Sequence, residues 1–86
     1  TLFPNVITPN NDGINDEWII EGLERVPDSE IMIYDRYGKL LVKYLASDPP
    51  WNGTYQNRPL PSDDYWYVII IKPTNKIHKG NVTLKR

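Results

Sequence analysis

Turn-forming residues interrupt this 86-residue chain about every eight to twelve positions. Glycine, proline and asparagine mark the breaks, most clearly at Gly22 and at residues 37–39, 52–53 and 73–75. No window of eleven or more residues repeats its apolar positions with the 3.6-residue period of an α-helix. This spacing restricts the chain to short strands that are joined by turns.

Seven segments have the residue types and the alternation of side chains that strands require. They are residues 1–7, 18–21, 30–36, 40–43, 54–55, 65–71 and 76–86. Residues 31–42 are predicted to form one hairpin. Because Pro4 interrupts the first segment, residues 1–7 are predicted to form a short edge strand.

Residues 65–71 are apolar on both faces, which predicts a central strand buried on both sides. In the last strand, Val82 and Leu84 should face the core while Thr83 and Lys85 face water. Together the segments predict an all-β fold, a small immunoglobulin-like antiparallel β-sandwich of six or seven strands. A chain of this length buries only about 60–65% of the surface that its unfolded form exposes, so we expect a thin core.

The composition excludes several classes of partner and site. A formal net charge of -1 provides no basic surface for nucleic acid or for an anionic membrane. The absence of cysteine excludes disulfide bonds, zinc–thiolate sites and a cysteine nucleophile. No apolar run is long enough to span a membrane, and residues 1–3 do not open a signal peptide. We therefore expect any export address to lie in the domain itself or outside this sequence.

One polar loop, residues 8–16, carries oxygen-bearing groups at every second position. The candidate ligands are the side chains of Thr8, Asn10, Asp12 and Asp16 and the carbonyl of Ile14. Oxygens at this spacing around a glycine are typical of loops that wrap calcium. The bidentate glutamate of an EF-hand is missing, because Ile19 stands at its position. The same residues form Asx turns with their own backbone equally well, so calcium and the plain turn both stay open.

Catalytic chemistry finds little support in the sequence. The single histidine, His78, stands in a lysine-bracketed hairpin arm with no serine or cysteine nearby. The carboxylate pairs are Asp12 with Asp16 and Asp63 with Asp64. The second pair is better explained as a polar turn before the central strand, and a domain this small has little room for a cleft of several hundred cubic ångströms. We therefore predict that the chain is not an enzyme.

The aromatic side chains, three Trp, six Tyr and one Phe, could form a core or a platform for stacking sugars. In a small sandwich the core is the favoured interpretation, because each aromatic buries about 150–250 Å². Tyr37 and Trp51 lie in predicted turns and are the two expected to stand exposed. A carbohydrate-binding or an adhesin-type β-sandwich module of an extracellular protein therefore stays open as an alternative function.

Several motifs follow one another in order along the chain. They are residues 8–16 with Trp18, Gly22-Leu23, residues 33–38 (Ile-Tyr-Asp-Arg-Tyr-Gly), residues 51–54 (Trp-Asn-Gly-Thr), Leu60-Pro61, residues 65–67, and residues 79–86 (Lys-Gly-Asn-Val-Thr-Leu-Lys-Arg). In this order they closely resemble the gliding-motility-associated C-terminal domain, over nearly the whole chain. That family is the type B sorting domain of the type IX secretion system of certain Gram-negative bacteria.

The resemblance implies that residues 1–86 are a single C-terminal sorting domain of a larger secreted or surface protein. Such a domain directs its cargo through the periplasm and across the outer membrane to the cell surface or medium. The implied partners are the outer-membrane type IX secretion machinery and the N-terminal cargo portion of the same chain, with no nucleic acid and no membrane insertion. The residues implied in recognition by the translocon are Lys79, Gly80, Val82, Thr83, Leu84 and Arg86.

The chain departs from the family pattern at two positions. Asn52 stands where the family usually has aspartate, so one turn loses a carboxylate. Asp63 stands where the family usually has the glycine of a turn, so a non-glycine residue is expected to make that bend.

Overall fold

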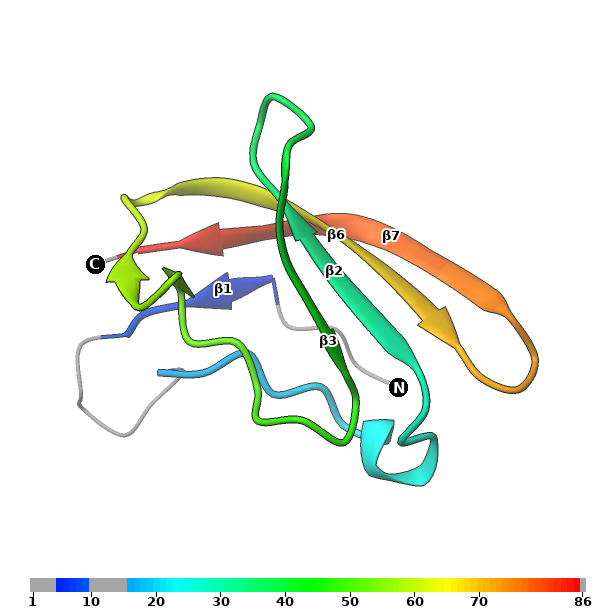
Figure 1. Ribbon diagram of the computed structural model, residues 1–86. Helices are drawn as coiled ribbons and strands as arrows, with labels where there is room; N and C mark the ends of the chain where they lie inside the picture. The colour runs from blue at the N-terminus through cyan, green and yellow to red at the C-terminus, as the bar shows by residue number, and fades with distance from the viewer. Residues whose placement is uncertain (1–4, 10–15, 86) are drawn as a thin grey trace.

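The computed structural model describes residues 5–9 and 16–85 (Figure 1). The described chain forms seven strands and one turn of 3₁₀-helix. The strands are β1 (Val6–Ile7), β2 (Glu30–Tyr34), β3 (Leu40–Leu45), β4 (Thr54–Tyr55), β5 (Arg58–Pro59), β6 (Asp63–Ile71) and β7 (Lys76–Leu84), and the helical turn η1 is Leu23–Arg25. Five strands form one sheet in the order β1-β7-β6-β2-β3, and β4 pairs with β5 in a separate hairpin. Within the described ranges, no helix is both long and apolar enough to cross a membrane.

The predicted hairpin of residues 31–42 is confirmed as the antiparallel pair β2–β3. Asp35 closes its turn, because its carboxylate accepts hydrogen bonds from the backbone N–H groups of Tyr37 and Lys39, both at 2.9 Å. Gly38 has φ +82°, a left-handed conformation that glycine adopts without steric cost. Local turn chemistry therefore fixes this hairpin.

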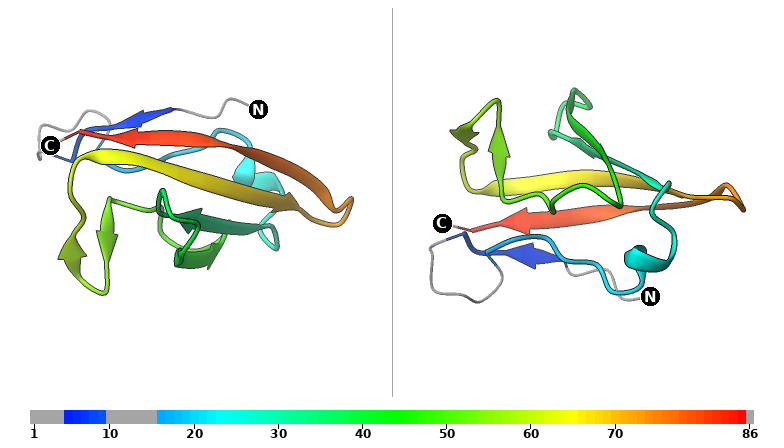
Figure 2. Two further views of the ribbon diagram at one scale, coloured as in Figure 1. Left: turned by 90° about the horizontal axis from the view of Figure 1, so that it is seen from above. Right: turned by 60° about the horizontal axis from the view of Figure 1, so that its bottom comes forward.

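β6 and β7 form a long antiparallel hairpin whose tip projects beyond the rest of the domain (Figure 2). β6 also pairs with β2 and is the central strand of the sheet, as predicted. β1 pairs with β7 in parallel, with Val6 opposite Thr83 and Ile7 opposite Leu84. The other pairs of described strands are antiparallel. β7 is therefore held between the strand that precedes it and the beginning of the chain.

The second layer of the domain covers one face of the sheet, here called the inner face. It consists of residues 16–29 and 46–62, which are mostly irregular and include the β4–β5 hairpin. Figure 1 shows these segments gathered below the sheet. The predicted all-β sandwich is confirmed, and its second layer consists largely of loops.

The core lies between the inner face and this loop layer. Its buried residues are Ile7, Trp18, Ile20, Ile31, Ile33, Trp51, Tyr65, Tyr67, Ile69, Val82 and Leu84. Trp18 packs on Tyr67 with ring centroids 4.9 Å apart, and Trp51 packs edge-to-face on Tyr65 at 5.8 Å. Each loop thus contributes one tryptophan that contacts the central strand.

The prediction that residues 65–71 are buried on both faces is wrong. Tyr65, Tyr67 and Ile69 enter the core, but Trp66 points to the opposite face and is 49% exposed. The described loop layer lies on the inner face alone, so the sheet has an outer face that these segments leave bare. An apolar run identifies a strand, but it does not tell whether both of its faces are covered.

Two further local predictions are wrong. Residues 18–21 alternate as a strand would, with Trp18 and Ile20 buried and Ile19 exposed, but they join neither sheet. Asp63 and Asp64 belong to β6 rather than to a turn before it. Residues 18–21 show that alternation predicts burial without predicting backbone pairing, and Asp63-Asp64 shows that residues common in turns also occur in strands.

Candidate functional site

β7 carries most of the residues that the sequence implicates in recognition, and its alternation divides them between the two faces of the sheet. Val82 and Leu84 are fully buried on the inner face, as predicted. Gly80 lies opposite the buried Tyr67. Val82 and Leu84 belong to the core and Gly80 packs beneath one of its rings, so these three residues support the fold.

Gly80 is required by the packing around it. A Cβ atom at this position would lie 2.6 Å from Oη of Tyr67 and 2.9 Å from its Cε2. The Tyr67 ring is buried and packs on Trp18, so it could move aside only by disturbing the core. The glycine therefore allows β6 and β7 to pair beneath a large aromatic ring.

Lys79 and Thr83 lie on the outer face, where a partner can reach them. Lys79 is exposed and stands opposite Val68 of β6. Thr83 donates a hydrogen bond from its hydroxyl to Oδ1 of Asp64 at 2.6 Å. Arg86, also implicated by the sequence, lies outside the described residues.

The predicted calcium loop is described only at its ends. Thr8 and Asp16 are half-buried, while Asn10, Asp12 and Ile14 lie outside the described residues. Within residues 5–9 and 16–85, no three His, Asp or Glu side chains gather as metal ligands would. The calcium site stays a prediction.

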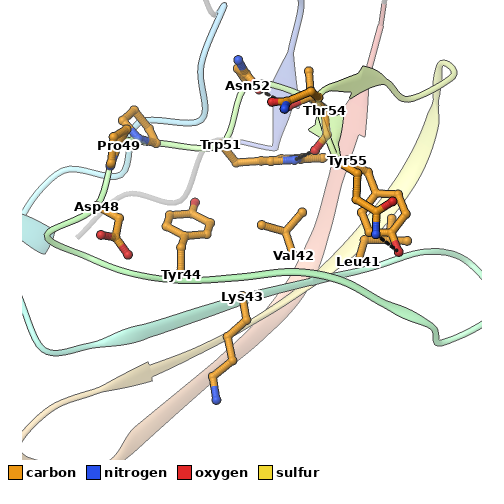
Figure 3. A pocket seen from close by; sticks show the side chains of 13 residues that line it. Leu41, Val42, Lys43, Tyr44, Asp48, Pro49, Trp51, Asn52, Thr54 and Tyr55 are labelled. Carbon is orange, nitrogen blue, oxygen red and sulfur yellow. Dashed lines mark hydrogen bonds between the residues drawn. The ribbon is translucent and has the colours of Figure 1, made fainter.

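An open groove of about 660 Å³ runs between the edge strand β3 and residues 48–57 (Figure 3). It is larger than the cleft expected for so short a chain. Asp48 is the one carboxylate in its lining, and this carboxylate accepts a hydrogen bond from the backbone N–H of Leu45 at 2.9 Å. Burial raises the pKa of Tyr44 on the groove wall to about 12. A backbone hydrogen bond from Trp51 lowers this pKa and offsets part of the rise. The lining therefore offers neither a carboxylate pair nor a nucleophile beside a base.

The other groups considered for catalysis are dispersed. His78 is half-buried on β7, opposite Ile69, and has interactions of its own. Asp63 lies 3.7 Å from the guanidinium of Arg36, and Asp64 accepts the hydrogen bond from Thr83. Neither aspartate lines the groove beside β3.

The predicted pair of exposed aromatics is half correct. Tyr37 is exposed, but Trp51 is buried, and its indole N–H donates to the carbonyl of Thr54 at 3.0 Å. The exposed tryptophan is instead Trp66. The signal for it was its alternation with Tyr65 and Tyr67, which places it on the opposite face. Sequence reasoning missed it because a pattern of side chains does not say which face a second layer covers.

Comparison with known protein families decides the assignment. The family model CHU_C, described as a type IX secretion signal domain, matches residues 1–84. The chain belongs to this family. The resemblance seen in the order of the sequence motifs is thereby confirmed. A type IX secretion signal marks a protein for export toward the cell surface or the medium.

A solved structure supports the fold of this secretion signal domain. The domain is similar to part of PorZ, an essential bacterial surface component of the type IX secretion system of Porphyromonas gingivalis, with a TM-score of 0.58 and 18% sequence identity. The match covers 69% of this chain and 8% of the PorZ chain, and at this identity it concerns the fold alone. No curated protein matches the chain.

Neither departure from the family pattern strains this secretion signal domain. Asp63 is not among the non-glycine residues with positive φ, so the expected glycine-like bend is absent at this position. Asn52 accepts a hydrogen bond from the hydroxyl of Thr54 at 2.7 Å through its side-chain oxygen. An aspartate would present the same acceptor, so the turn keeps this hydrogen bond without the carboxylate.

Proposed function

We propose that this secretion signal domain is a non-catalytic C-terminal sorting domain of a larger cargo protein. It directs the cargo from the periplasm across the outer membrane to the cell surface or the medium. The match of the secretion signal family to residues 1–84 carries this proposal. The cargo precedes the domain in the same chain, and the domain acts as a folded handle for the secretion machinery.

The outer-membrane secretion machinery recognises the end of the domain. Lys79, Thr83 and Arg86 contact it, while Gly80, Val82 and Leu84 hold the strand in place. The alternation of β7 supports this division, because Val82 and Leu84 are buried while Lys79 is exposed. The two functions are carried by one strand and can be separated by mutation.

A non-catalytic function agrees with the chemistry of the groove beside β3. Its lining combines aromatic and proline side chains with a single carboxylate.

Calcium is proposed to bind the loop at Thr8, Asn10, Asp12, Ile14 and Asp16. There it would stabilise the connection between β1 and the second layer, whose first described residue is Asp16.

A fusion experiment tests the proposed function. Residues 1–86 are attached to the C-terminus of a periplasm-directed reporter in a bacterium that has a type IX system. The reporter should reach the medium or the cell surface, and it should stay in the periplasm of an otherwise identical strain whose type IX system is inactive. Retention in the first strain, with the domain shown to be folded by limited proteolysis, would contradict the proposal.

A shortened fusion tests how much β7 contributes to export. Removing residues 79–86 deletes more than half of the strand, including Val82 and Leu84, and should abolish export. Circular dichroism of the shortened domain shows how much of that loss comes from unfolding. Export of the shortened fusion at the level of the full domain would show that the end of the chain is not recognised.

A further inference from the structure

The outer face of the sheet carries a continuous apolar surface, here called the outer patch. It consists of Met32, Tyr34, Leu40, Leu45, Trp66, Val68, Ile70 and Ile77, which strand register places on one side of four neighbouring strands. Trp66 is 49% exposed and Ile77 is 57% exposed. None of the eight belongs to the core cluster or packs against it in the described structure. An exposed apolar surface of this extent on a small domain indicates an interaction site.

Positive charges flank the outer patch on both sides. Its central row across the sheet runs Lys43, Met32, Val68, Lys79, from β3 through β2 and β6 to β7. Lys43 lies 3.2 Å from a carboxylate oxygen of Glu30, and Lys72 lies 4.0 Å from the other oxygen of the same group. One carboxylate is thus shared by two ammonium groups. This corner keeps an excess of positive charge, and Lys79 adds another at the opposite edge.

We propose that the outer patch is the surface by which the secretion machinery binds this domain, through a protein partner with an apolar centre and a carboxylate rim. The inference rests on the proposed sorting function and extends it from the end of β7 to four strands of the sheet. Trp66, in the row next to the central one, is the type of residue that acts as an anchor in protein interfaces. The flanking lysines select the partner by charge complementarity.

The charges on the outer face disfavour a second copy of the chain as the partner. In a face-to-face dimer with its two-fold axis through the centre of the patch, the lysines at the ends of the central row would meet. This holds whether the axis runs along or across the strands. Like charges brought together in this way oppose association.

An anionic membrane surface is disfavoured for a different reason. The outer face also carries Glu30 and Asp64, and the whole chain has a formal net charge of -1. Membrane-binding surfaces gain their affinity from clusters of unopposed basic residues. The mixed pattern of charges here is typical of a surface that meets a specific protein partner.

The test measures reporter export by fusions that carry single substitutions. Trp66→Ala, Ile77→Ser and Lys79→Glu change the outer patch, and Ile19→Ser and Lys76→Glu are the matched controls. Ile19 is 63% exposed and lies in the loop layer, on the other side of the sheet, and Lys76 is an exposed residue of β7 whose alternation places it away from the patch. Export should fall by about tenfold or more for the patch variants, as expected when an anchor or charged contact of an interface is lost, and by less than about twofold for the controls.

Charge is tested separately from side-chain length. Lys79→Arg should export like the wild type, because it keeps the positive charge that Lys79→Glu reverses. Thermal melts establish that each variant is folded, and Ile77→Ser should melt like the wild type because Ile77 is already exposed. Wild-type export by folded Trp66→Ala, Ile77→Ser and Lys79→Glu fusions would overturn the proposal.

Two binding measurements test the alternative partners, a second copy of the chain and an anionic membrane. Sedimentation of the isolated chain should show a monomer, and vesicles containing an anionic phospholipid should leave it in solution. A dimer that Ile77→Ser dissolves, or vesicle binding that Lys79→Glu abolishes, would overturn the assignment to a protein partner. If the wild-type fusion itself is not exported, the proposed function fails. If the wild type and the patch variants are exported equally, the function stands and the inference about the patch fails.

Discussion

The inner and outer faces of the five-stranded sheet both carry large apolar side chains, yet within residues 5–9 and 16–85 a second layer covers only the inner one. On β6 the inner face presents Tyr65, Tyr67 and Ile69, which are buried. The outer face of the same strand presents Trp66, Val68 and Ile70, outside the core cluster. The difference lies in the loop layer, because its two tryptophans pack on Tyr67 and Tyr65.

Hydrophobic side chains therefore serve two purposes in this sheet. Burial of apolar surface contributes about 25 cal/mol per Å², so the inner face supplies most of the stability of a small domain. The outer face leaves Leu40, Leu45, Trp66 and Ile77 exposed to water and forgoes part of that contribution. The predictions below test the contrast, beginning with the largest expected effect.

Two isoleucines on opposite faces provide the sharpest test of stability. Ile69 is fully buried on the inner face, and Ile69→Ala should lower the free energy of unfolding by about 2–5 kcal/mol. Ile77 is exposed on the outer face, and Ile77→Ala should change it by about 0.5 kcal/mol or less. Urea denaturation of both variants measures the difference. Equal losses would show that the two faces are equally covered.

Neighbouring residues of β7 repeat the contrast on one strand. Gly80→Ala forces a Cβ atom against the buried Tyr67 ring and should cost about 1–3 kcal/mol. Asn81→Ala, at the adjacent exposed position, is the control and should stay within about 0.5 kcal/mol of the wild type. Thermal melts provide the measurement. A neutral Gly80→Ala would mean that the Tyr67 ring moves aside freely.

Alkaline pH tests the loop layer beside β3. Burial raises the pKa of Tyr44 from 10.0 to about 12, so the folded state favours the neutral phenol. The resulting stability is fully present below pH 10, declines as the pH rises toward 12 and amounts to about 3 kcal/mol at most. In Tyr44→Phe this part of the decline should disappear from urea melts recorded between pH 9 and pH 12. An identical pH dependence in the two proteins would show that Tyr44 is open to solvent.

Calcium should have the smallest of these effects. A site with two carboxylates and no bidentate glutamate is expected to bind at about 10⁻⁴–10⁻³ M. Calcium at ten times the dissociation constant would then add about 1.4 kcal/mol to the stability. Melts in EDTA, calcium and magnesium, repeated on Asp12→Ala, provide the test. An unchanged midpoint in calcium, with Asp12→Ala still destabilised, would identify the loop as a self-bonded Asx turn.

The sequence predicted much of the sheet, because its strands carry strong local signals. Alternation identified β2, β3 and β7, and a continuous apolar run identified β6. Alternation also correctly placed Val82 and Leu84 in the core. Residues 79–86 also carried part of the resemblance that identified the family. These features depend on neighbouring residues, which the sequence displays directly.

Most of the features that were missed depend on contacts between distant segments, and one depends on an unusual turn. The parallel pairing of β1 with β7 joins residues almost eighty positions apart, and no local sequence pattern predicts it. The β4–β5 turn uses Gln56 and Asn57, both with positive φ, and glutamine is an uncommon residue in that conformation. The exposure of Trp66 depends on where the loop layer lies. The recognition residues were inferred from a family resemblance, and alternation alone did not distinguish their structural and binding roles.

In the proposed arrangement, the outer face is recognised and the inner face maintains the fold. The most direct test measures reporter export and the urea midpoint for variants of both faces and compares the two quantities. Ile69→Val and Gly80→Ala should lose export only as far as they lose stability, whereas Ile77→Ser and Lys79→Glu should lose export at wild-type stability. If all four variants fall on one curve of export against stability, export depends on folding alone and the proposed arrangement is contradicted.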